Sequence, residues 1–384
     1  MPLNILVLCH EYPPIGGGAG VACATLTERF VAAGHSATVL TMGFGDLPER
    51  DVLHGVPVER LACGRKRREM ASPFEALRWA EQCWNRVSSD DTSFDVVHAH
   101  FIMPAGIVAA RMRRRFGVPF VITAHGSDVP GFNRERLRLA HLAVRPWWRR
   151  ICRDADCIVS PSSALLSLIE RSADDVRSTI IPHAAETRFA PSAKERRVLL
   201  CSRLVERKGV HRFLQAIGDL DLPGWEIDIV GTGPLSGRLT QLAAISRTPV
   251  RLHGWLDNHD PRLAELYSRA AIFALPSERE NFPVSLLEAM SAGCAVLGTR
   301  VPGIPEVVGP AGLLVPLHDD AALRAAVLRL TRDDVVRTIL AAQGRERVAT
   351  EFEPDSIAGR YLSCFHRLRA AVTSRRREEV ECQS

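Results

Sequence analysis

The sequence predicts an α/β protein built from two doubly wound domains, because short apolar runs alternate with longer amphipathic stretches along the chain. The apolar runs are nearly continuous, as expected of parallel strands that are covered on both faces. The first series of strands comprises residues 5–9, 37–41, 96–99, 120–123 and 157–160, and the second comprises 198–201, 227–230, 271–275 and 295–297. Helical patterns lie between the strands, for example at residues 20–33, 74–87, 134–150 and 209–220.

The chain of 384 residues is long enough for two such domains, each with its own core. The two series of strands are separated near residues 183–195, which contain few apolar residues and no clear period. We therefore expect an N-terminal domain over residues 1–187 and a C-terminal domain over residues 188–353. Because ligands of open α/β sheets bind beyond the carboxyl ends of the strands, a cleft between the two domains is the expected site.

The bulk composition is typical of a soluble globular protein. Apolar residues make up 46% of the chain and charged residues 24%. No apolar run approaches the roughly 20 residues that are needed to span a bilayer. The first residues lead directly into an apolar strand without a basic region, so we expect no signal peptide and a cytoplasmic location. The ten cysteines show no metal-ligand spacing, which favours structural thiols over metal or redox chemistry.

The net charge of +5 is mild, but basic residues cluster at 65–68, 111–115 and 134–150. These clusters fit either solvated helix faces or contacts with an anionic partner. The segment 134–150 also contains Trp147 and Trp148, and Trp beside Arg suits a membrane interface with anionic headgroups. Peripheral contact with an anionic membrane and a lipid-linked acceptor is one interpretation; buried Trp among solvated Arg side chains is the other. Nucleic acid is disfavoured as a partner, because no binding motif accompanies the modest charge.

The most informative segment, residues 277–308, carries two carboxylates separated by seven residues. Glu280 is expected on a loop before Pro283, a residue suited to the first turn of a helix, and Glu288 is expected inside that helix. Ionised carboxylates accept hydrogen bonds from vicinal hydroxyls, so the pair can hold two parts of one polyhydroxylated ligand. Two Glu residues at this spacing mean little alone, and the signal depends on the motifs around them.

Two strand ends carry features that suit a phosphate. The first strand leads into Gly17 and Gly18 before a helix begins, so backbone N–H groups and the helix dipole favour an anion there. A simple tight turn is the alternative, and the loop lacks the Lys and Ser/Thr of a P-loop ATPase. The first strand of the second domain is followed by Arg203 and Lys208, which can bind phosphate as a planar fork and a point charge. An exposed basic turn is the alternative there.

Histidines follow two strands of the first domain. His125 comes after the strand at 120–123 and precedes a glycine, a position that faces a cleft and not a core. Asp128, three residues later, is a candidate for orienting the imidazole or binding an acceptor. His100 ends another strand and is a weaker acceptor-side candidate.

Taken in order, these motifs resemble those of the retaining, nucleotide-sugar-dependent glycosyltransferases of family 4, which have the GT-B fold. The E-x7-E pair, the N-terminal Gly-Gly loop, the T-x-H-G-x-D string and the Arg/Lys pair all match, in both domains and in the family's order. The resemblance implies two Rossmann-like domains that face each other across a cleft. It also implies a further strand at residues 252–256, whose end meets the nucleotide base in the family. It also implies that a last helix and tail, at residues 354–384, cross back to the N-terminal domain.

The same resemblance implies roles for individual residues. The implied catalytic residues are Glu280, His125, Arg203 and Lys208, and the implied acceptor-side residues are His100, His125 and Asp128. The implied donor-binding set is Gly17, Gly18, Arg203, Lys208, Gly231, Gly254, Glu280, Asn281, Phe282, Val284 and Glu288. The partners are then a nucleotide-diphosphate sugar as donor and a glycan or lipid-linked acceptor. No cofactor and no metal are expected, because Arg203 and Lys208 can neutralise the donor diphosphate.

One segment departs from the family pattern: residues 181–186 read IPHAAE where the family has an IPNGVD type of sequence. The change lies near the expected hinge and leaves the shape of the cleft and the substrate open. The implied function is sugar transfer in the synthesis of a surface polysaccharide, lipopolysaccharide or glycolipid. A non-hydrolysing sugar-nucleotide epimerase and a non-catalytic binding subunit are the alternatives, and the intact set of carboxylates and cations favours transfer over both.

Overall fold

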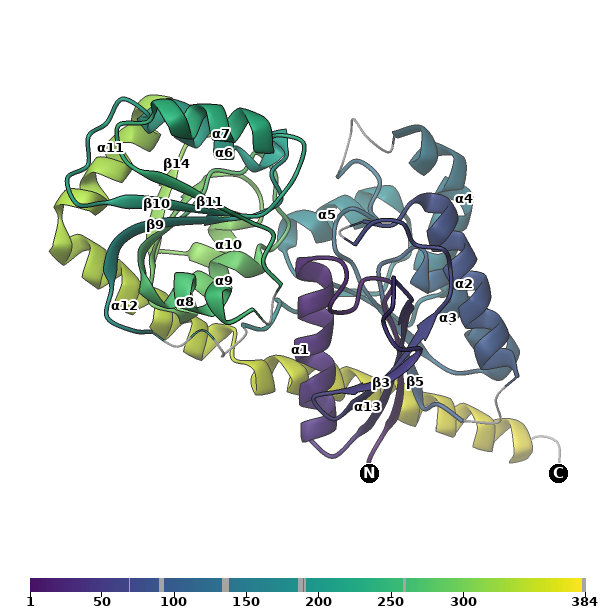
Figure 1. Ribbon diagram of the computed structural model, residues 1–384. Helices are drawn as coiled ribbons and strands as arrows, with labels where there is room; N and C mark the ends of the chain where they lie inside the picture. The colour runs from purple at the N-terminus through teal and green to yellow at the C-terminus, as the bar shows by residue number, and fades with distance from the viewer. Residues whose placement is uncertain are drawn as a thin grey trace. The chain divides into compact units, whose positions relative to one another are not determined.

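The computed structural model describes residues 1–68, 70–89, 93–132, 138–185, 189, 191–257 and 260–381. The chain divides into two compact units (Figure 1). Unit 1 comprises Met1–Ala184 together with Pro354–Ser384, and unit 2 comprises Ala185–Glu353. The boundary expected from the sequence, after residue 187, lies outside the described residues.

Among the described residues, unit 1 contains an eight-stranded sheet in the order β3-β4-β2-β1-β5-β6-β7-β8. All neighbouring strands are parallel except β3 and β4. The strands are β1 (Asn4–Leu8), β2 (Ser36–Met42), β3 (Arg50–Leu53), β4 (Val56–Leu61), β5 (Val96–His100), β6 (Phe120–Thr123), β7 (Cys157–Ser160) and β8 (Ser178–Ile180). The helices are α1 (Gly18–Ala32), α2 (Pro73–Ser88), α3 (Ala105–Phe116), α4 (Arg138–Asp154), α5 (Ser163–Ser172) and α13 (Pro354–Glu381).

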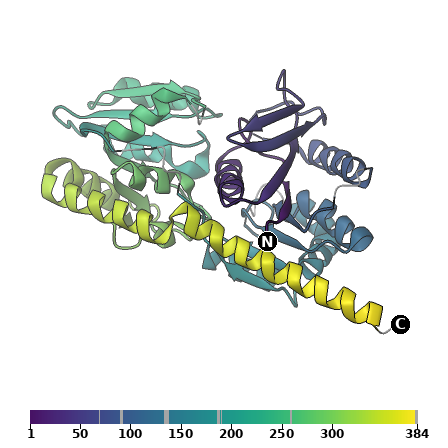
Figure 2. The same cartoon turned by 90° about the horizontal axis from the view of Figure 1, so that it is seen from below.

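Each face of this sheet is buried in its own core, because successive side chains of a strand point to opposite faces. In β1, Leu6 and Leu8 belong to one core with α2, α3, α4 and α5. Ile5 and Val7 belong to the other, together with α1 and α13. The long helix α13 (Figure 2) packs in this second core, where Phe365 lies 5.5 Å from Phe30 of α1 between ring centroids. The C-terminal helix therefore contributes to the core of the N-terminal sheet.

Unit 2 contains a six-stranded parallel sheet in the order β11-β10-β9-β12-β13-β14, counted over the residues described. The strands are β9 (Glu195–Cys201), β10 (Glu226–Val230), β11 (Val250–Gly254), β12 (Ala270–Leu275), β13 (Ala295–Thr299) and β14 (Gly312–Val315). A 3-10 turn, η1 (Glu206–Lys208), follows β9. The helices are α6 (Val210–Ile217), α7 (Ser236–Ile245), α8 (Pro261–Arg269), α9 (Val284–Ser291), α10 (Ile304–Val308), α11 (Asp320–Arg332) and α12 (Asp334–Glu351).

The predicted fold class is confirmed, because both units are parallel α/β sheets with a buried core on each face. Four strands have no counterpart among the predicted ones: β3, β4, β8 and β14. The helix predicted at 134–150 corresponds to α4, which begins at Arg138 and continues to Asp154. The first part of that prediction, up to residue 137, lies outside the described residues.

Candidate active site

The loops after β9 and β12 in unit 2 are held together by backbone contacts. Gly209 has a φ of +68°, and a Cβ there would lie 2.0 Å from the carbonyl oxygen of Pro276. The backbone N–H of Glu278 also donates to the carbonyl oxygen of Arg207 at 2.8 Å. Only glycine fits this close approach, since any side chain would clash with backbone in a left-handed conformation. These contacts bring the loop after β9 next to the loop after β12.

Lys208 and Glu280 meet at this junction and form an ion pair. Lys208 Nζ lies 2.6 Å from Glu280 Oε1, and the two side chains are only 17% and 10% exposed. The sequence predicted both residues for a donor site, and the structure brings them into direct contact. When one member of such a partly buried ion pair is removed, the charge of the other is left uncompensated. A substitution at either residue therefore also affects the electrostatic environment of its partner.

The turns after β10 and β11 join the same assembly. Gly231 has a φ of +131°, and a Cβ there would lie 1.9 Å from the carbonyl oxygen of Ser202. Its N–H donates to the carbonyl oxygen of Gly254 at 2.7 Å. Arg203, in the loop after β9, is half-buried, and its guanidinium forms no ion pair within the part of the chain that is described. Four strand ends of unit 2 thus supply one compact set of loops, with a cation that can accept an anionic ligand.

Glu288 lies on α9, about one turn after the start of the helix, and is 7% exposed. It neighbours two side chains that sequence reasoning did not select, Tyr267 and Cys201. Burial raises the pKa of Cys201 to about 12, with Glu288 acting in the same direction and Lys208 against it. Burial, Cys201 and Glu288 also raise the pKa of Tyr267 well above its ordinary value. Both neighbours are therefore neutral at physiological pH, so they add no second negative charge beside Glu288.

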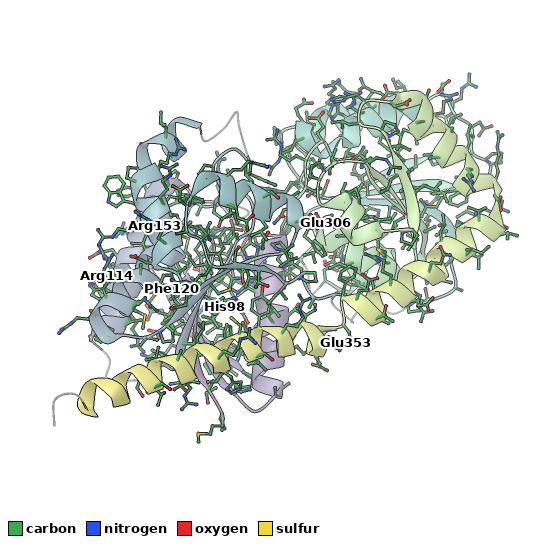
Figure 3. All side chains as sticks on the ribbon, turned by 180° about the vertical axis from the view of Figure 1, so that it is seen from behind. His98, Arg114, Phe120, Arg153, Glu306 and Glu353 are labelled. Carbon is green, nitrogen blue, oxygen red and sulfur yellow. The ribbon has the colours of Figure 1, made fainter. Side chains whose placement is uncertain are left out.

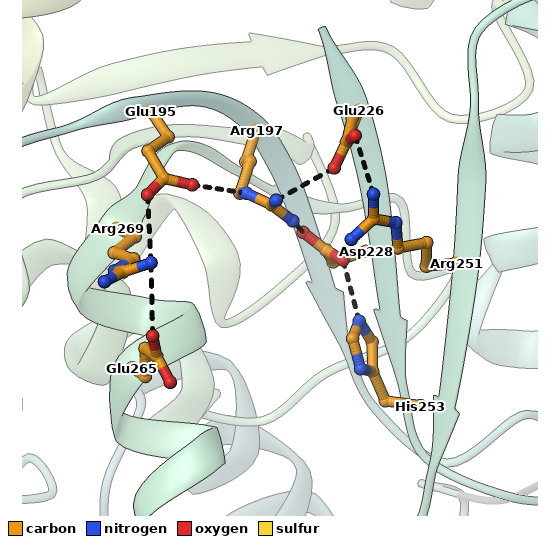
Figure 4. A network of polar contacts seen from close by, with 8 residues as sticks. All are labelled: Glu195, Arg197, Glu226, Asp228, Arg251, His253, Glu265 and Arg269. Atoms are coloured by element: carbon orange, nitrogen blue, oxygen red, sulfur yellow. Dashed lines mark hydrogen bonds and ion pairs between the residues drawn. The ribbon is translucent and has the colours of Figure 1, made fainter.

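A polar network supports β11, the edge strand that ends at Gly254 (Figure 4). Asp228 of β10 is 1% exposed in its side chain and lies between Arg197 and His253. Its two carboxylate oxygens are 2.8 Å from Arg197 Nη1 and 2.7 Å from His253 Nε2. The pattern of single charged residues within otherwise apolar strands is the only sequence signal for this network. Its position next to the turn after β11 makes it a support for that turn.

In unit 1, the Gly-rich loop after β1 is held by the basic segment 65–68. Arg65 is 6% exposed, and its Nη1 donates to the carbonyl oxygen of His10 at 2.9 Å. Arg68 Nε donates to the carbonyl oxygen of Pro14 at 3.0 Å, and its own carbonyl accepts the N–H of Gly16 at 2.9 Å. For Arg65, neither interpretation of this basic cluster was right, because the side chain is neither solvated nor turned to an external anion. It shapes the loop that leads to Gly17 and Gly18, both of which are exposed.

The two predicted histidines of unit 1 are in direct contact. His100 Nδ1 lies 3.0 Å from His125 Nε2, and their rings are stacked with centroids 5.3 Å apart. His183 stacks on His125 at 5.3 Å as well, with an interplanar angle of 22°. His98, labelled in Figure 3, lies 4.3 Å from the His100 ring and shares a hydrogen bond with Thr123 Oγ1 at 2.8 Å. The segment that departs from the family pattern therefore adds an imidazole to this group.

Asp128 fixes the loop that carries His125, and it does so through the backbone. Its Oδ2 accepts the N–H of Ile102 at 2.7 Å, and its Oδ1 accepts the backbone N–H of His125 at 3.1 Å. Burial raises the pKa of Asp128 to about 6, although these hydrogen bonds oppose the shift. Trp148 Nε1 donates to the Asp128 carbonyl at 2.8 Å. The partner of the His125 ring is therefore His100, and Trp148 is a buried structural residue.

Two family models match this chain. One, described as Glycosyltransferase Family 4, matches residues 16–189, and the other, described as Glycosyl transferases group 1, matches residues 195–333. Together they cover both units in the order that the sequence motifs indicated. The chain belongs to the family 4 glycosyltransferases.

Relatives of this glycosyltransferase align over nearly the whole chain. The N-acetyl-alpha-D-glucosaminyl L-malate synthase of Bacillus anthracis is 25% identical over 95% of this chain and 97% of its own length. The putative teichuronic acid biosynthesis glycosyltransferase TuaC of Bacillus subtilis is 26% identical over 85% of this chain and 83% of its own.

Solved structures confirm the GT-B fold. The sucrose-phosphate synthase of Thermosynechococcus elongatus has a TM-score of 0.81 at 23% identity, covering 96% of this chain and 100% of that one. Anabaena HepE in complex with UDP-glucose has a TM-score of 0.73 at 16% identity, covering 95% of this chain and 99% of that one.

The remaining predicted residues of the glycosyltransferase precede or begin α9. The side chains of Phe282 and Val284 are buried in the core of unit 2, where Phe282 packs on Phe352 at 5.6 Å between ring centroids. These two residues can therefore meet a ligand only through their backbone. Asn281 is 8% exposed in the same loop.

Two further features bear on the site of the glycosyltransferase. No group of three or more His, Cys, Asp and Glu side chains is arranged to hold a metal ion among the described residues. Within the same residues, no helix has both the length and the apolar character needed to cross a bilayer.

Proposed function

We propose that this protein transfers a sugar from a nucleotide-diphosphate sugar to a glycan or lipid-linked acceptor with retention of anomeric configuration and without a metal ion. The single observation that carries the proposal is the Lys208–Glu280 ion pair, held at 2.6 Å beside the buried Glu288. A cation and two carboxylates at one set of strand ends suit a ligand that has both phosphate oxygens and hydroxyl groups. A nucleotide-diphosphate sugar is such a ligand.

In this proposal the protein acts mainly through electrostatics. Transfer breaks the bond between the anomeric carbon and the diphosphate oxygen, and it forms a bond from that carbon to an acceptor hydroxyl. Negative charge then develops on the leaving diphosphate, where Lys208 and Arg203 supply positive charge without the reorganisation that water would need. The acceptor proton passes to an oxygen of the leaving phosphate. In unit 1, the backbone N–H groups at Gly17 and Gly18 can bind a phosphate oxygen, as expected of a helix N-terminus.

The carboxylates bind the two ends of the donor. Glu288 accepts hydrogen bonds from the ribose hydroxyls, and Glu280 accepts from the sugar hydroxyls and stabilises positive charge at the anomeric centre. Lys208 is paired with Glu280 Oε1 in the structure, and in this proposal it turns towards the phosphate when the donor binds, which frees that oxygen for a sugar hydroxyl. Donor binding is thus an exchange of partners for Lys208.

Relatives support the substrate class. HepE, a neighbour with the same fold, is known in complex with UDP and glucose and with UDP-glucose. TuaC and the colanic acid glycosyltransferase WcaL of Salmonella typhimurium carry names that refer to surface polysaccharides. We therefore propose a nucleotide-sugar donor and an acceptor from surface-glycan synthesis.

A binding screen tests the donor. We would measure melting temperature and heat of binding with UDP-, GDP-, ADP- and dTDP-sugars in the presence of a chelator. A donor at 100 times its Kd stabilises the folded state by about 2.7 kcal/mol. Glu288→Ala should abolish the response to the selected donor, whereas Glu278→Ala, in the loop before α9, should retain it. Lys208→Ala should lower turnover by about 10²-fold or more. Normal kinetics in both Glu288→Ala and Lys208→Ala would contradict the site.

We also propose that α4 contacts an anionic membrane where a lipid-linked acceptor resides. Leu142 and Trp147 are 63% and 65% exposed on this helix, and Arg145 and Arg150 are exposed beside them. Apolar and basic side chains on one exposed helix suit an interface with anionic headgroups. Further basic residues, among them Arg114 of α3 and Arg153 of α4, are labelled in Figure 3.

The membrane proposal is tested by sedimentation with vesicles that contain anionic lipid. Trp147→Ser combined with Arg145→Gln and Arg150→Gln should reduce binding, with an effect that weakens at high salt. Arg149 is left in place, because its Nε donates to the carbonyl oxygen of Ser172. The matched control replaces Arg300, Arg332 and Arg345, which are exposed in unit 2. Equal binding of the two triple variants would contradict a role for α4.

A further inference from the structure

The ring of His125 is in contact with three other aromatic rings. The centroids of the His100 and His183 rings each lie 5.3 Å from its centroid, at interplanar angles of 20° and 22°. Phe101 packs against it with the ring centroids 4.6 Å apart. Its Nε2 is 3.0 Å from His100 Nδ1. His125 is partly exposed, and its Nδ1 makes no hydrogen bond to any described residue, so this nitrogen is the one left for a ligand.

The hydrogen bond between the two rings can be made in two ways, and burial distinguishes between them. If His125 donates from Nε2, a neutral His100 must carry its own proton on Nε2. That nitrogen is buried and has no partner among the described residues. A buried N–H without an acceptor costs about 1–3 kcal/mol. If His100 donates from Nδ1 instead, its Nε2 has only a bare lone pair, and orphaned acceptors are tolerated better than orphaned N–H groups.

Neither ring gains from becoming charged. His100 is 0% exposed, and His98 and His183 lie in ring contact with this pair. Burial lowers the pKa of His100 and of His125 well below 6.5, and the neighbouring imidazoles act in the same direction. The carboxylate closest in the chain, Asp128, bonds the backbone N–H of His125, and no hydrogen bond joins it to the ring among the described contacts. Both imidazoles are therefore neutral, and only the choice of tautomer remains.

We infer that His100 is a positioning residue that fixes His125 as the Nδ1–H tautomer, so that His125 gives the substrate a hydrogen-bond donor and not a base. The ligand group that it takes is an oxygen with a free lone pair, such as a sugar hydroxyl or a phosphate oxygen. This inference rests on the proposed function for the identity of that ligand. The tautomer itself follows from the contacts within unit 1.

The Nδ1–H tautomer limits what His125 can do in the reaction. A neutral imidazole whose Nε2 accepts a hydrogen bond and whose Nδ1 is protonated has no lone pair free to take the acceptor proton. Proton removal therefore has to occur elsewhere, which agrees with transfer to the leaving phosphate. The ring of His183 lies against that of His125, with the centroids 5.3 Å apart, and helps to hold its orientation.

The tautomer is measured directly by long-range proton–nitrogen correlation spectra of the full chain labelled with 15N-histidine. His125 is assigned by the signals that disappear in His125→Phe. We expect the Nδ1–H pattern between pH 6 and 8, and an Nε2–H pattern or a charged ring would overturn the inference. His100→Asn, which keeps an N–H near the position of Nδ1, should preserve the pattern. His100→Leu, which has no donor, should change it, and an unchanged pattern would count against His100 as its cause.

Kinetics give a second and independent readout. His125→Asn keeps a donor near the position of Nδ1, whereas His125→Gln keeps one near Nε2. The loss of one neutral hydrogen bond of about 1.4 kcal/mol lowers kcat/KM about tenfold, so His125→Gln should fall about tenfold below His125→Asn. Equal values or the reverse order would contradict the inference. Because the spectra need no substrate, a protein that binds no nucleotide sugar would refute the proposed function and still report the tautomer.

Discussion

Acidification should unfold unit 1 at a pH at which unit 2 remains folded, because unit 1 buries a group of neutral imidazoles. Burial lowers the pKa of His10 and of His98 to about 3, and that of His183 to about 4. The ordinary value in an unfolded chain is about 6.5. The folded state therefore binds fewer protons than the unfolded state between these limits. Stability is complete above pH 6.5 and is lost as the pH falls towards 4.

The magnitude follows from the same values. Between pH 7 and pH 5, each of the three histidines should cost the folded state about 2 kcal/mol, or about 6 kcal/mol together. Asp128 acts in the opposite direction, because its pKa is raised to about 6 and its ionised form is disfavoured by burial. Partial protonation of Asp128 at pH 5 should return about 1 kcal/mol. These three histidines and Asp128 give a net loss of about 5 kcal/mol, which is comparable with the entire stability of many domains. The lowered pKa values of His100 and His125 add to this loss.

Hydrogen exchange measured by mass spectrometry separates the two units. Protection factors, corrected for the intrinsic pH dependence, should fall by about 10³- to 10⁴-fold in β5 and β6 between pH 7 and pH 5, since 1.36 kcal/mol corresponds to tenfold. Strands β10 and β12 of unit 2 should change much less, because His10, His98 and His183, whose pKa values burial lowers to about 3 or 4, all lie in unit 1.

His183→Asn is the matched control, because it removes one of the titrating rings. The variant should lose about 2 kcal/mol less than the wild type over the same pH interval, whatever its stability at pH 7. Equal losses of protection in the two units would refute the reasoning, and so would a His183→Asn variant with an unchanged pH dependence.

Three further results are expected. Glu280→Gln should bind the free nucleoside diphosphate more tightly than the wild type, because Lys208 loses its carboxylate partner, whereas sugar transfer should fall. Titration calorimetry measures the binding and a product assay measures the transfer. Weaker binding of the nucleoside diphosphate would contradict the exchange of partners by Lys208. Arg65→Met should destabilise unit 1 by about 2–3 kcal/mol, because the carbonyl of His10 loses its buried donor. Denaturant unfolding measures this change in the free energy of unfolding, and Arg67→Met, at an exposed position, is the control. Asp228→Ala should cost about 3 kcal/mol and raise the KM for donor more than it lowers kcat, whereas a normal KM would separate this network from the turn after β11.

The parallel sheets were predictable because their strands are long apolar runs that remain buried on both faces. The strands that were missed lack this signal for physical reasons. β8 has only three residues. β3 is an antiparallel strand at the edge of the sheet, where part of the strand faces solvent and its residues need not be apolar. The E-x7-E pair was predictable because its spacing is local. That Lys208 reaches Glu280 was not, since the contact depends on the fit of Gly209 against Pro276, which no local pattern contains.

The basic segment 65–68 shows why charge clusters are ambiguous in a sequence. The sequence does not distinguish Arg65 from Arg67, yet Arg65 is buried and Arg67 is exposed. The difference arises because the Arg65 guanidinium donates to the carbonyl of His10 in the loop after β1 and also to the carbonyls of Arg67 and Arg68 in its own segment. In the proposed function the N–H groups at Gly17 and Gly18 bind a phosphate, so they cannot also stabilise the loop. Arg65 therefore stabilises the loop through its carbonyls, and the N–H side at Gly17 and Gly18 remains available.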